Sequence, residues 1–195
     1  MRTLMGEGAT EVIASLLVDI NSSILEFMIL RFPDLGGQTK PVTEWEIRKE
    51  DLSSEAARDL VRLHLEGMHA HSPPGSVFAL DFSGLLAPEV TLWAAWQAAE
   101  IAGIGALKDL GGGAGEIKSM RTHPKFLRRG IAASLLEHII GVAKVTGMKR
   151  LSLETGSGMY FEPALSLYRR RGFVNCNEFA DYKRTAFNQF LHLNL

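Results

Sequence analysis

Apolar and polar residues alternate at the start of the regular part of the chain. Trp45 and Ile47 stand between charged neighbours, and this period of two predicts a half-buried first strand. The apolar spacing then changes to every third or fourth position as far as Ala70, which predicts an amphipathic helix. The acidic and serine residues at 51–55 are typical of a helix start, and the Ser-Pro-Pro-Gly sequence at 72–75 is expected to end the helix.

Two apolar runs, at 90–97 and 101–110, are separated by a short polar turn, and we interpret them as a β-hairpin. The segment before them, residues 76–86, is expected to form a short helix or an irregular loop. The glycine-rich residues 111–115 predict a further turn, after which a fourth strand begins around Ile117.

Helix and strand signals continue to alternate to the end of the chain. The predicted elements are a helix at 129–145 ended by Gly147, a strand at 150–155, a helix with Pro163 in its first turn that runs to Arg170, and closing strands at 173–182 and 187–193. This order predicts a mixed α/β layered domain over residues 43–195.

Residues 1–42 differ from the rest of the chain. A helical pattern at 10–30 is followed by a Pro-Asp-Leu-Gly-Gly break at 33–37, so we interpret residues 1–42 as an N-terminal extension that is helical or partly disordered. If helical, its apolar face would pack on the domain or on a partner, and a homodimer is one such arrangement.

Composition narrows the class of partner. The chain has 195 residues, of which 46% are hydrophobic, and a net charge of −1, so one well-filled core and small-molecule partners are expected, without nucleic acid. The apolar run at 12–30 is interrupted by charged residues, which argues against a membrane span. The single cysteine, Cys176, excludes an internal disulfide and fits a reducing, cytoplasmic compartment.

The stretch from Glu116 to Leu136 predicts a strand, a tight basic turn and a helix. Arg128 and Arg129 lie in the turn, and Gly130 removes the side chain where the backbone bends into the helix. The first amides of a helix are unpaired and lie at the positive end of its dipole, so this turn is a candidate phosphate site. Many such turns only connect two elements, and that alternative stays open on spacing alone.

A second segment, Ala164 to Phe173, contains Tyr168 and ends in Gly-Phe. With the basic turn and the order of elements, it makes residues 43–195 resemble the GNAT superfamily of acetyl-coenzyme-A-dependent N-acetyltransferases. The resemblance implies an α/β (α+β) fold with a twisted, mostly antiparallel sheet of about six to seven strands. Helices would cover both sheet faces, strands 4 and 5 would splay apart, and acetyl-CoA would be the cosubstrate. No metal is expected, because His69 and His71 have no carboxylate or cysteine at a suitable ligand spacing.

The resemblance also assigns the coenzyme site. Gly130-Ile131-Ala132 fits the last three places of the family's turn motif, whereas Leu127 stands where Gln or Arg is usual, and Phe161 replaces a common asparagine. Backbone amides would then hold the pyrophosphate. The implied coenzyme residues are Met120, Arg121 and Thr122 along the pantetheine arm, and Leu127, Arg128, Arg129, Gly130, Ile131, Ala132 and Ala133 at the pyrophosphate.

Two catalytic roles follow from the same resemblance. Tyr168 would donate a proton to the departing thiolate, and Glu116 would accept the proton of the amine. Glu154 is the alternative base, or a residue that orients the substrate. Without the resemblance, Tyr168 could equally be a core residue of its helix and Glu116 a solvated charge at a strand end.

The acceptor is expected to be a primary amine of a small molecule. Its pocket is expected to use residues around the first helix and the hairpin, namely His69, His71, Phe78, Asp81 and Trp93, together with Glu154 at the end of the predicted strand 150–155. Asp81 could instead cap a turn, and Trp93 could belong to the core. An N-acetyltransferase for protein or peptide amines, and a non-catalytic acyl-CoA sensor, are the alternative functions.

Overall fold

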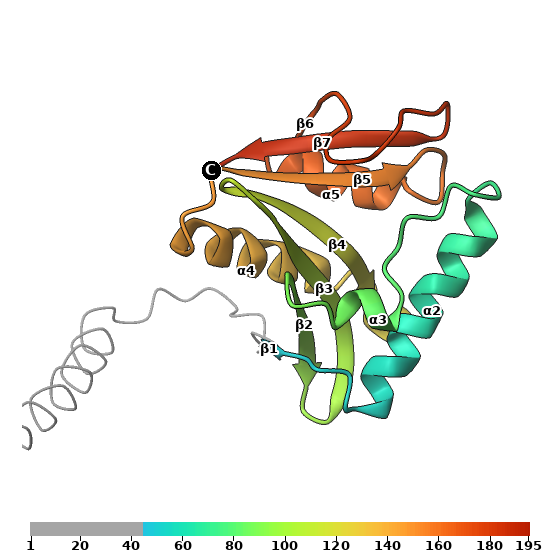
Figure 1. The fold of residues 1–195 in the computed structure, drawn as a ribbon. Helices are drawn as coiled ribbons and strands as arrows, with labels where there is room; N and C mark the ends of the chain where they lie inside the picture. The colour runs from blue at the N-terminus through green and yellow to red at the C-terminus, as the bar shows by residue number, and fades with distance from the viewer. Residues whose placement is uncertain (1–44) are drawn as a thin grey trace, which may run out of the picture. The chain divides into compact units, whose positions relative to one another are not determined.

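The computed structural model describes residues 45–195, so the predicted extension of residues 1–42 lies outside the described part of the chain. A seven-stranded sheet has the order β1-β2-β3-β4-β5-β7-β6 (Figure 1). The strands are β1 Glu46–Lys49, β2 Val90–Gln97, β3 Glu100–Gly111, β4 Ala114–Thr122, β5 Arg150–Gly156, β6 Val174–Asn175 and β7 Asn188–Asn194. The helices are α2 Glu55–His71, α3 Phe82–Leu85, the 3-10 turn η1 Pro124–Phe126, α4 Ile131–Val145 and α5 Glu162–Arg170.

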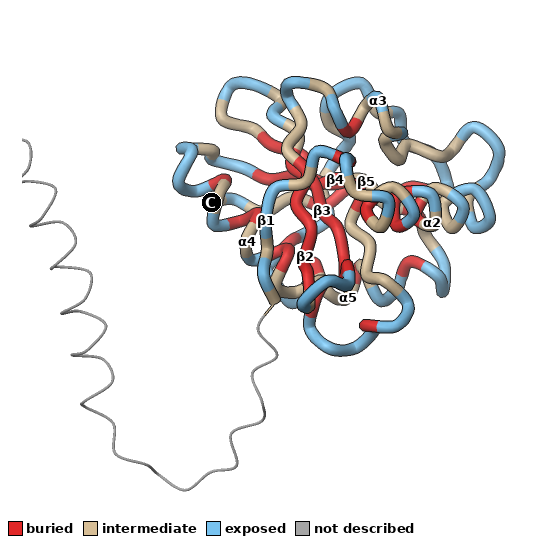
Figure 2. The backbone as a smooth tube through the Cα atoms, turned by 90° about the horizontal axis from the view of Figure 1, so that it is seen from below, coloured by how far each residue is buried: buried red, intermediate tan, exposed pale blue. Residues whose placement is uncertain are grey.

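All neighbouring strands are antiparallel except β4 and β5, which are parallel. Helices α2 and α4 lie on opposite faces of strands β2 to β4 (Figure 1), and these strands form the buried centre of the domain (Figure 2). Along β2, alternate side chains enter two hydrophobic clusters: Leu92 packs in the cluster of α2, and Trp93 in that of α4. The predicted mixed fold with helices on both faces is confirmed.

The expected splay between strands 4 and 5 is also confirmed. β4 and β5 pair only where Ala114–Glu116 runs beside Arg150–Ser152. Beyond that point the strands diverge toward the C-terminal end of α2 (Figure 1). A register shift between β3 and β4 accompanies the divergence, and Ser119 has a φ of 52° there. The splay leaves the second half of β4 without a partner on its β5 side.

The helix limits follow the sequence signals. Ser54 caps α2, because its side chain accepts a hydrogen bond from the Ala57 amide. Gly147 has a φ of 81° and its amide donates to the Lys144 carbonyl, so a left-handed turn ends α4 as expected. The predicted hairpin and the two later helices are likewise present.

The predicted closing strand at 173–182 is wrong beyond its first residues, because β6 spans only Val174–Asn175. The following residues, Asn177, Glu178 and Asp181, are poor strand formers, and Ala180 has a φ of 48°. The segment instead forms a loop over the sheet that carries Tyr182 toward β4.

Within residues 45–195, no helix is both long and apolar enough to cross a membrane. In the same part of the chain, no group of three His, Cys, Asp or Glu side chains is arranged to hold a metal ion.

Candidate active site

One cavity occupies the space opened by the splay of β4 and β5. Its volume is about 590 Å³, and its walls come from β4, the start of α4, the end of β5, α5, α2 and the loop after α2. All the predicted coenzyme residues except Arg129 line this cavity. The Arg129 guanidinium lies 5.5 Å from the centre of the Phe126 ring instead.

At one end of the cavity lies the turn before α4. The amides of residues 128–133 donate no backbone hydrogen bond to any residue in the 45–195 range, and the first helical bond is donated by Ser134 to Gly130. Arg128 and Gly130 have φ angles of 61° and 94°, and such left-handed residues turn neighbouring amides to a common side. A left-handed φ is uncommon for arginine and costs about 1–2 kcal/mol. Such a strained residue beside unpaired amides is typical of a functional turn.

Leu127 differs from its expected role in one respect. Its amide donates to the Pro124 carbonyl at 3.4 Å and closes the 3-10 turn, so the run of unpaired amides begins at Arg128. The Leu127 side chain lines the cavity and is 58% exposed. Phe161, the other departure from the family pattern, is buried in the wall and packs edge-to-face on Phe187.

Glu116 lies in a buried cluster next to the cavity. Its carboxylate accepts a hydrogen bond from the Tyr182 hydroxyl at 2.5 Å and lies 3.2 Å from the Lys118 ammonium. Lys118 also donates to Tyr182 at 2.6 Å and to the Phe78 carbonyl at 2.9 Å. Lys118 lines the cavity, but Glu116 is 3% exposed and is not among the lining residues. Its negative charge is therefore already engaged by two partners.

Glu154 is the carboxylate that lines the cavity, at the end of β5. Burial raises the pKa of Glu154 to about 7; Lys118 acts in the opposite direction, and Glu116 adds to the increase. A carboxylate with a pKa near neutrality is suited to accept a proton at physiological pH.

His64 on α2 also lines the cavity, although the sequence pattern favoured His69 and His71. Burial, together with the nearby charges of Arg121 and Lys118, lowers the pKa of His64 to about 4. The imidazole is therefore neutral at physiological pH. The signal in the sequence was its spacing, because His64 continues the buried α2 face of Leu60 and Val61.

Tyr168 on α5 lines the cavity and is otherwise buried, with its ring against Phe173. Burial raises the pKa of the Tyr168 hydroxyl, so the phenol stays protonated. It is thus present in the form that a proton donor requires.

The predicted acceptor residues separate into two groups. Phe78 lines the cavity, and His71 stacks on Tyr160, a lining residue, with ring centres 3.7 Å apart. Asp81 instead caps α3, accepting from the Gly84 amide at 2.8 Å. Trp93 is buried in the core, and His69 in the last turn of α2 is not among the lining residues. The structure therefore brings Phe78, His71 and Glu154 to one region and leaves out Asp81, Trp93 and His69.

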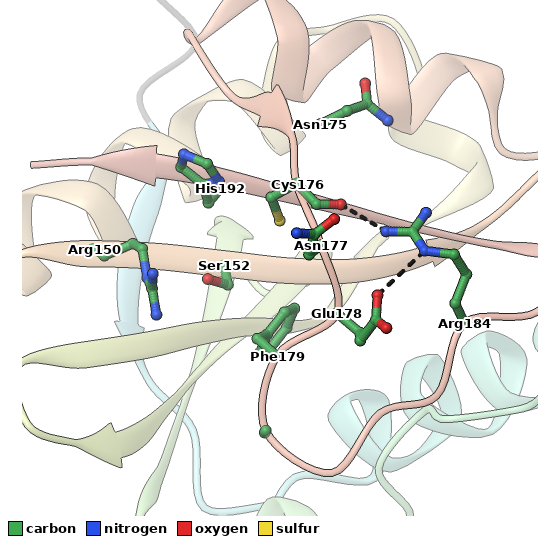
Figure 3. Close-up of a pocket in the computed structure, with 10 residues that line it drawn as sticks. Arg150, Ser152, Asn175, Cys176, Asn177, Glu178, Phe179, Arg184 and His192 are labelled. Carbon is green, nitrogen blue, oxygen red and sulfur yellow. Dashed lines mark hydrogen bonds and ion pairs between the residues drawn. The ribbon is translucent and has the colours of Figure 1, made fainter.

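A second hollow, beneath the loop after β6, contains Cys176 (Figure 3). It shares no lining residue with the first cavity. Arg184 is held there between the Cys176 carbonyl at 2.9 Å and the Glu178 carboxylate at 3.2 Å. Burial raises the pKa of the Cys176 thiol, so it is a weak nucleophile. The Cys176 thiol therefore lies outside the main cavity and keeps its proton. Both properties argue against Cys176 as a carrier of the acyl group.

Comparisons with known proteins agree with this geometry. The sequence profile of the Acetyltransferase (GNAT) family matches residues 52–173. The chain is 50% identical over 145 residues to the uncharacterized N-acetyltransferase YsnE of Bacillus subtilis (strain 168), covering 74% of this chain and 96% of YsnE. It is 46% identical over 149 residues to the uncharacterized N-acetyltransferase YedL of Escherichia coli (strain K12), covering 76% of this chain and 94% of YedL.

Among solved structures, a Bacillus subtilis acetyltransferase in complex with CoA superposes with a TM-score of 0.59. The superposition covers 78% of this chain and 99% of that one at 19% sequence identity, so the likeness concerns the fold.

Proposed function

Because this chain belongs to the Acetyltransferase (GNAT) family, we propose that it transfers the acetyl group of acetyl-CoA to the primary amine of a small molecule. The transfer would occur by direct attack within a ternary complex. One observation carries the proposal: a single cavity joins residues 128 and 130–133, whose amides are unpaired, to the carboxylate of Glu154. One end suits an anionic phosphate and the other suits a proton-bearing amine.

The coenzyme would enter with its pyrophosphate on the turn before α4. The amides of residues 128–133 and the positive end of the α4 dipole converge there, and Arg128 adds a charge at the rim. The pantetheine arm would follow Met120, Arg121 and Thr122 of β4, whose backbone is unpaired on the splayed side. Bound in this way, acetyl-CoA supplies the thioester that the amine attacks.

We assign the base to Glu154 in preference to Glu116. Glu154 lines the cavity and its pKa of about 7 lets it accept a proton near neutral pH. Glu116 is buried behind the lining and is held by Lys118 and Tyr182. In this proposal Glu116 balances the Lys118 charge and helps to keep the Glu154 pKa high.

Tyr168 would act as the acid. As the amine nitrogen bonds to the thioester carbonyl carbon and the C–S bond breaks, the amine proton passes to Glu154 and the sulfur takes the Tyr168 proton. A free thiol has a pKa of about 8.5, so a departing thiolate is basic enough to be protonated near neutral pH. The burial of Tyr168 keeps its proton in place until the sulfur leaves.

The proposal is tested by release of free thiol from acetyl-CoA with a panel of small amines and peptides. A parallel thermal-shift titration measures coenzyme binding, because ligand at one hundred times its dissociation constant adds about 2.7 kcal/mol to stability. Binding with thiol release for small amines is the expected result. Binding without release for any acceptor would favour an acyl-CoA sensor, turnover of peptides alone would favour a protein substrate, and no binding would contradict all three.

A further inference from the structure

Arg121 is a cation in the cavity wall that has no counter-charge in the described part of the chain. Its side chain leaves β4 on the α2 side, whereas Met120 before it packs toward Gly105 on the α4 side. Its guanidinium pairs with no carboxylate of residues 45–195. The Arg121 Nε is buried without a hydrogen-bond partner there, and Nη1 donates to the Tyr160 hydroxyl at 2.7 Å. A buried guanidinium donor of this kind favours an anionic ligand.

The other charged groups near Arg121 are already balanced. Lys118 lies 3.2 Å from the Glu116 carboxylate, and His64 is neutral. The remaining lining arginines come from other elements: Arg128 from the turn before α4 and Arg170 from the last turn of α5, where it donates to Ser166. The α2 side of the cavity thus contains one uncompensated cation, Arg121. The cavity also contains one carboxylate, Glu154, whose pKa is near neutral pH.

The packing around Arg121 fixes its position. Gly67 lies in the middle of α2, where glycine weakens a helix relative to alanine. A Cβ atom at Gly67 would lie 2.5 Å from the Tyr160 hydroxyl oxygen and 3.4 Å from the Arg121 Nη1. His71 stacks on the ring of the same Tyr160. The missing side chain therefore allows Tyr160 and Arg121 to approach α2 closely.

We propose, resting on the function proposed above, that Arg121 binds a carboxylate of the acceptor, so that the acceptor is an amine that also carries a carboxylate, as an amino acid does. The planar guanidinium can donate two parallel hydrogen bonds to a carboxylate. The amine of the same molecule would lie at Glu154. Met68, Phe78 and Ala79 form an apolar wall on the α2 side, which suits an amino acid with an apolar side chain.

The test compares matched acceptors with and without the carboxylate: the apolar L-amino acids, their amides, and the corresponding decarboxylated amines. Thiol release from acetyl-CoA gives kcat/KM for each. We expect the amino acid of a pair to exceed its amide by about 10–100-fold, the range for a charge-assisted hydrogen-bonded contact. Arg121→Met should remove this preference with little change in the KM for acetyl-CoA, because the pantetheine arm would follow the backbone of β4 and not the Arg121 side chain. Arg121→Lys should keep part of the preference.

Arg62→Met is the matched control, because Arg62 lies on the exposed part of α2 in surface ion pairs with Glu55 and Asp59. It should leave the preference unchanged. Tyr160→Phe removes the hydroxyl that accepts from Arg121, so it should raise KM for the amino acid more than it lowers kcat. A change in KM that exceeds the change in kcat indicates that Tyr160 positions Arg121, whereas a loss of folding would lower kcat as well.

Equal kcat/KM for acid and amide, or a preference that survives Arg121→Met, would overturn the inference and leave the acetyltransferase proposal standing. Turnover only of carboxylate-free amines would do the same. Absence of thiol release with every acceptor from a protein that binds acetyl-CoA would instead overturn the proposed function, and the inference with it.

Discussion

Glu154 and Glu116 lie on neighbouring strands, but their carboxylates differ in how far their charge is compensated. Glu116 pairs with Lys118 and Tyr182 within the cluster, so its charge is compensated. Glu154 is half-buried at the cavity wall and its charge is less compensated, so its pKa rises to about 7. The resemblance to the GNAT superfamily assigned the base to Glu116, because neither the Tyr182 contact nor the direction of the Glu154 side chain can be inferred from local pattern.

The pH dependence of catalysis follows from the Glu154 pKa. Glu154 must be ionised to accept the amine proton, so kcat/KM should rise as pH increases through about 7. Glu154→Gln should lower the rate by about 10²–10⁴-fold, the usual contribution of a general base, and remove this limb of the profile. Glu137→Gln, at a surface pair with Arg171, is the control. An unchanged profile in Glu154→Gln would exclude Glu154 as the base.

The same residue affects stability with a predictable sign. The folded-state pKa of Glu154, about 7, exceeds its reference value of 4.5, so the unfolded chain ionises first as pH rises. Its stabilising contribution is therefore present below about 4.5 and is lost as pH approaches 7. Glu154→Gln mimics the protonated form and should be more stable than wild type at pH ~8, by about 1–3 kcal/mol, with little difference at pH ~4. Urea denaturation at both pH values measures this, and equal stabilities at the higher pH would contradict the raised pKa.

Tyr168→Phe should separate proton donation from coenzyme binding. Loss of the hydroxyl should slow turnover by about 10²–10⁴-fold if the phenol is the general acid. The apolar ring still fills the wall against Phe173, so the dissociation constant for coenzyme should change little. Stopped-flow thiol release measures the turnover rate, and coenzyme titration measures the dissociation constant. Normal turnover in the variant would remove Tyr168 from the mechanism.

Some residues of the site could be predicted and others could not. The residues of the turn before α4 are consecutive, so their role is visible in a local motif. Tyr182, Arg121 and Tyr160 act through contacts between distant segments: Tyr182 is 66 residues from Glu116, and Tyr160 is 39 residues from Arg121. The hydrophobic periodicity of the sequence does not reveal contacts between such distant residues.

At the scale of elements, α4 lies close to the sheet because β3 has glycines beneath it. A Cβ atom at Gly103 would lie 2.7 Å from the Ile131 Cγ2 and 3.0 Å from the Arg121 carbonyl oxygen. Ile131 is the first residue of α4, so the packing at Gly103 also positions the unpaired amides. The end of the cavity where we propose that the coenzyme binds therefore depends on a strand residue that does not line it.

Two glycine-to-alanine variants test this dependence. Gly103→Ala should destabilise the domain by about 1–3 kcal/mol through overpacking and should weaken coenzyme binding. Gly141→Ala on α4 meets no atom within 4 Å, so it should stabilise the domain by about 0.4–1 kcal/mol and leave binding intact. Thermal unfolding and coenzyme titration of both variants measure the effects. If the two variants have the same stability and the same coenzyme affinity, the close approach at Gly103 does not position the turn before α4.

The elements were predicted well where one signal dominates. The helix α2 and the hairpin of β2 and β3 have clear periodicity, and their limits fall near those expected. The segment at 173–182 has aromatic residues that are typical of strands, but these residues contact Glu116 and the core from a loop. Tertiary contacts outweighed local propensity there.

At the scale of the molecule, the family and the fold were predictable because they depend on the order of elements and on two compact motifs. The resemblance to the GNAT superfamily, the acetyltransferase class and the mostly antiparallel sheet are all confirmed. The splay places the turn before α4, the candidate base and the candidate acid in one cavity. The acceptor pocket was harder to predict from the sequence, since its wall combines residues of α2, the loop after α2 and β4.

Direct transfer from acetyl-CoA to an amine in a ternary complex can be tested by an initial-velocity experiment. Rates of thiol release are measured over a grid of acetyl-CoA and amino-acid concentrations and plotted reciprocally. Direct transfer predicts intersecting lines and no acetyl group on the protein after incubation with acetyl-CoA alone. Parallel lines with a covalent acetyl-enzyme would contradict it, because they indicate a ping-pong reaction through a protein nucleophile.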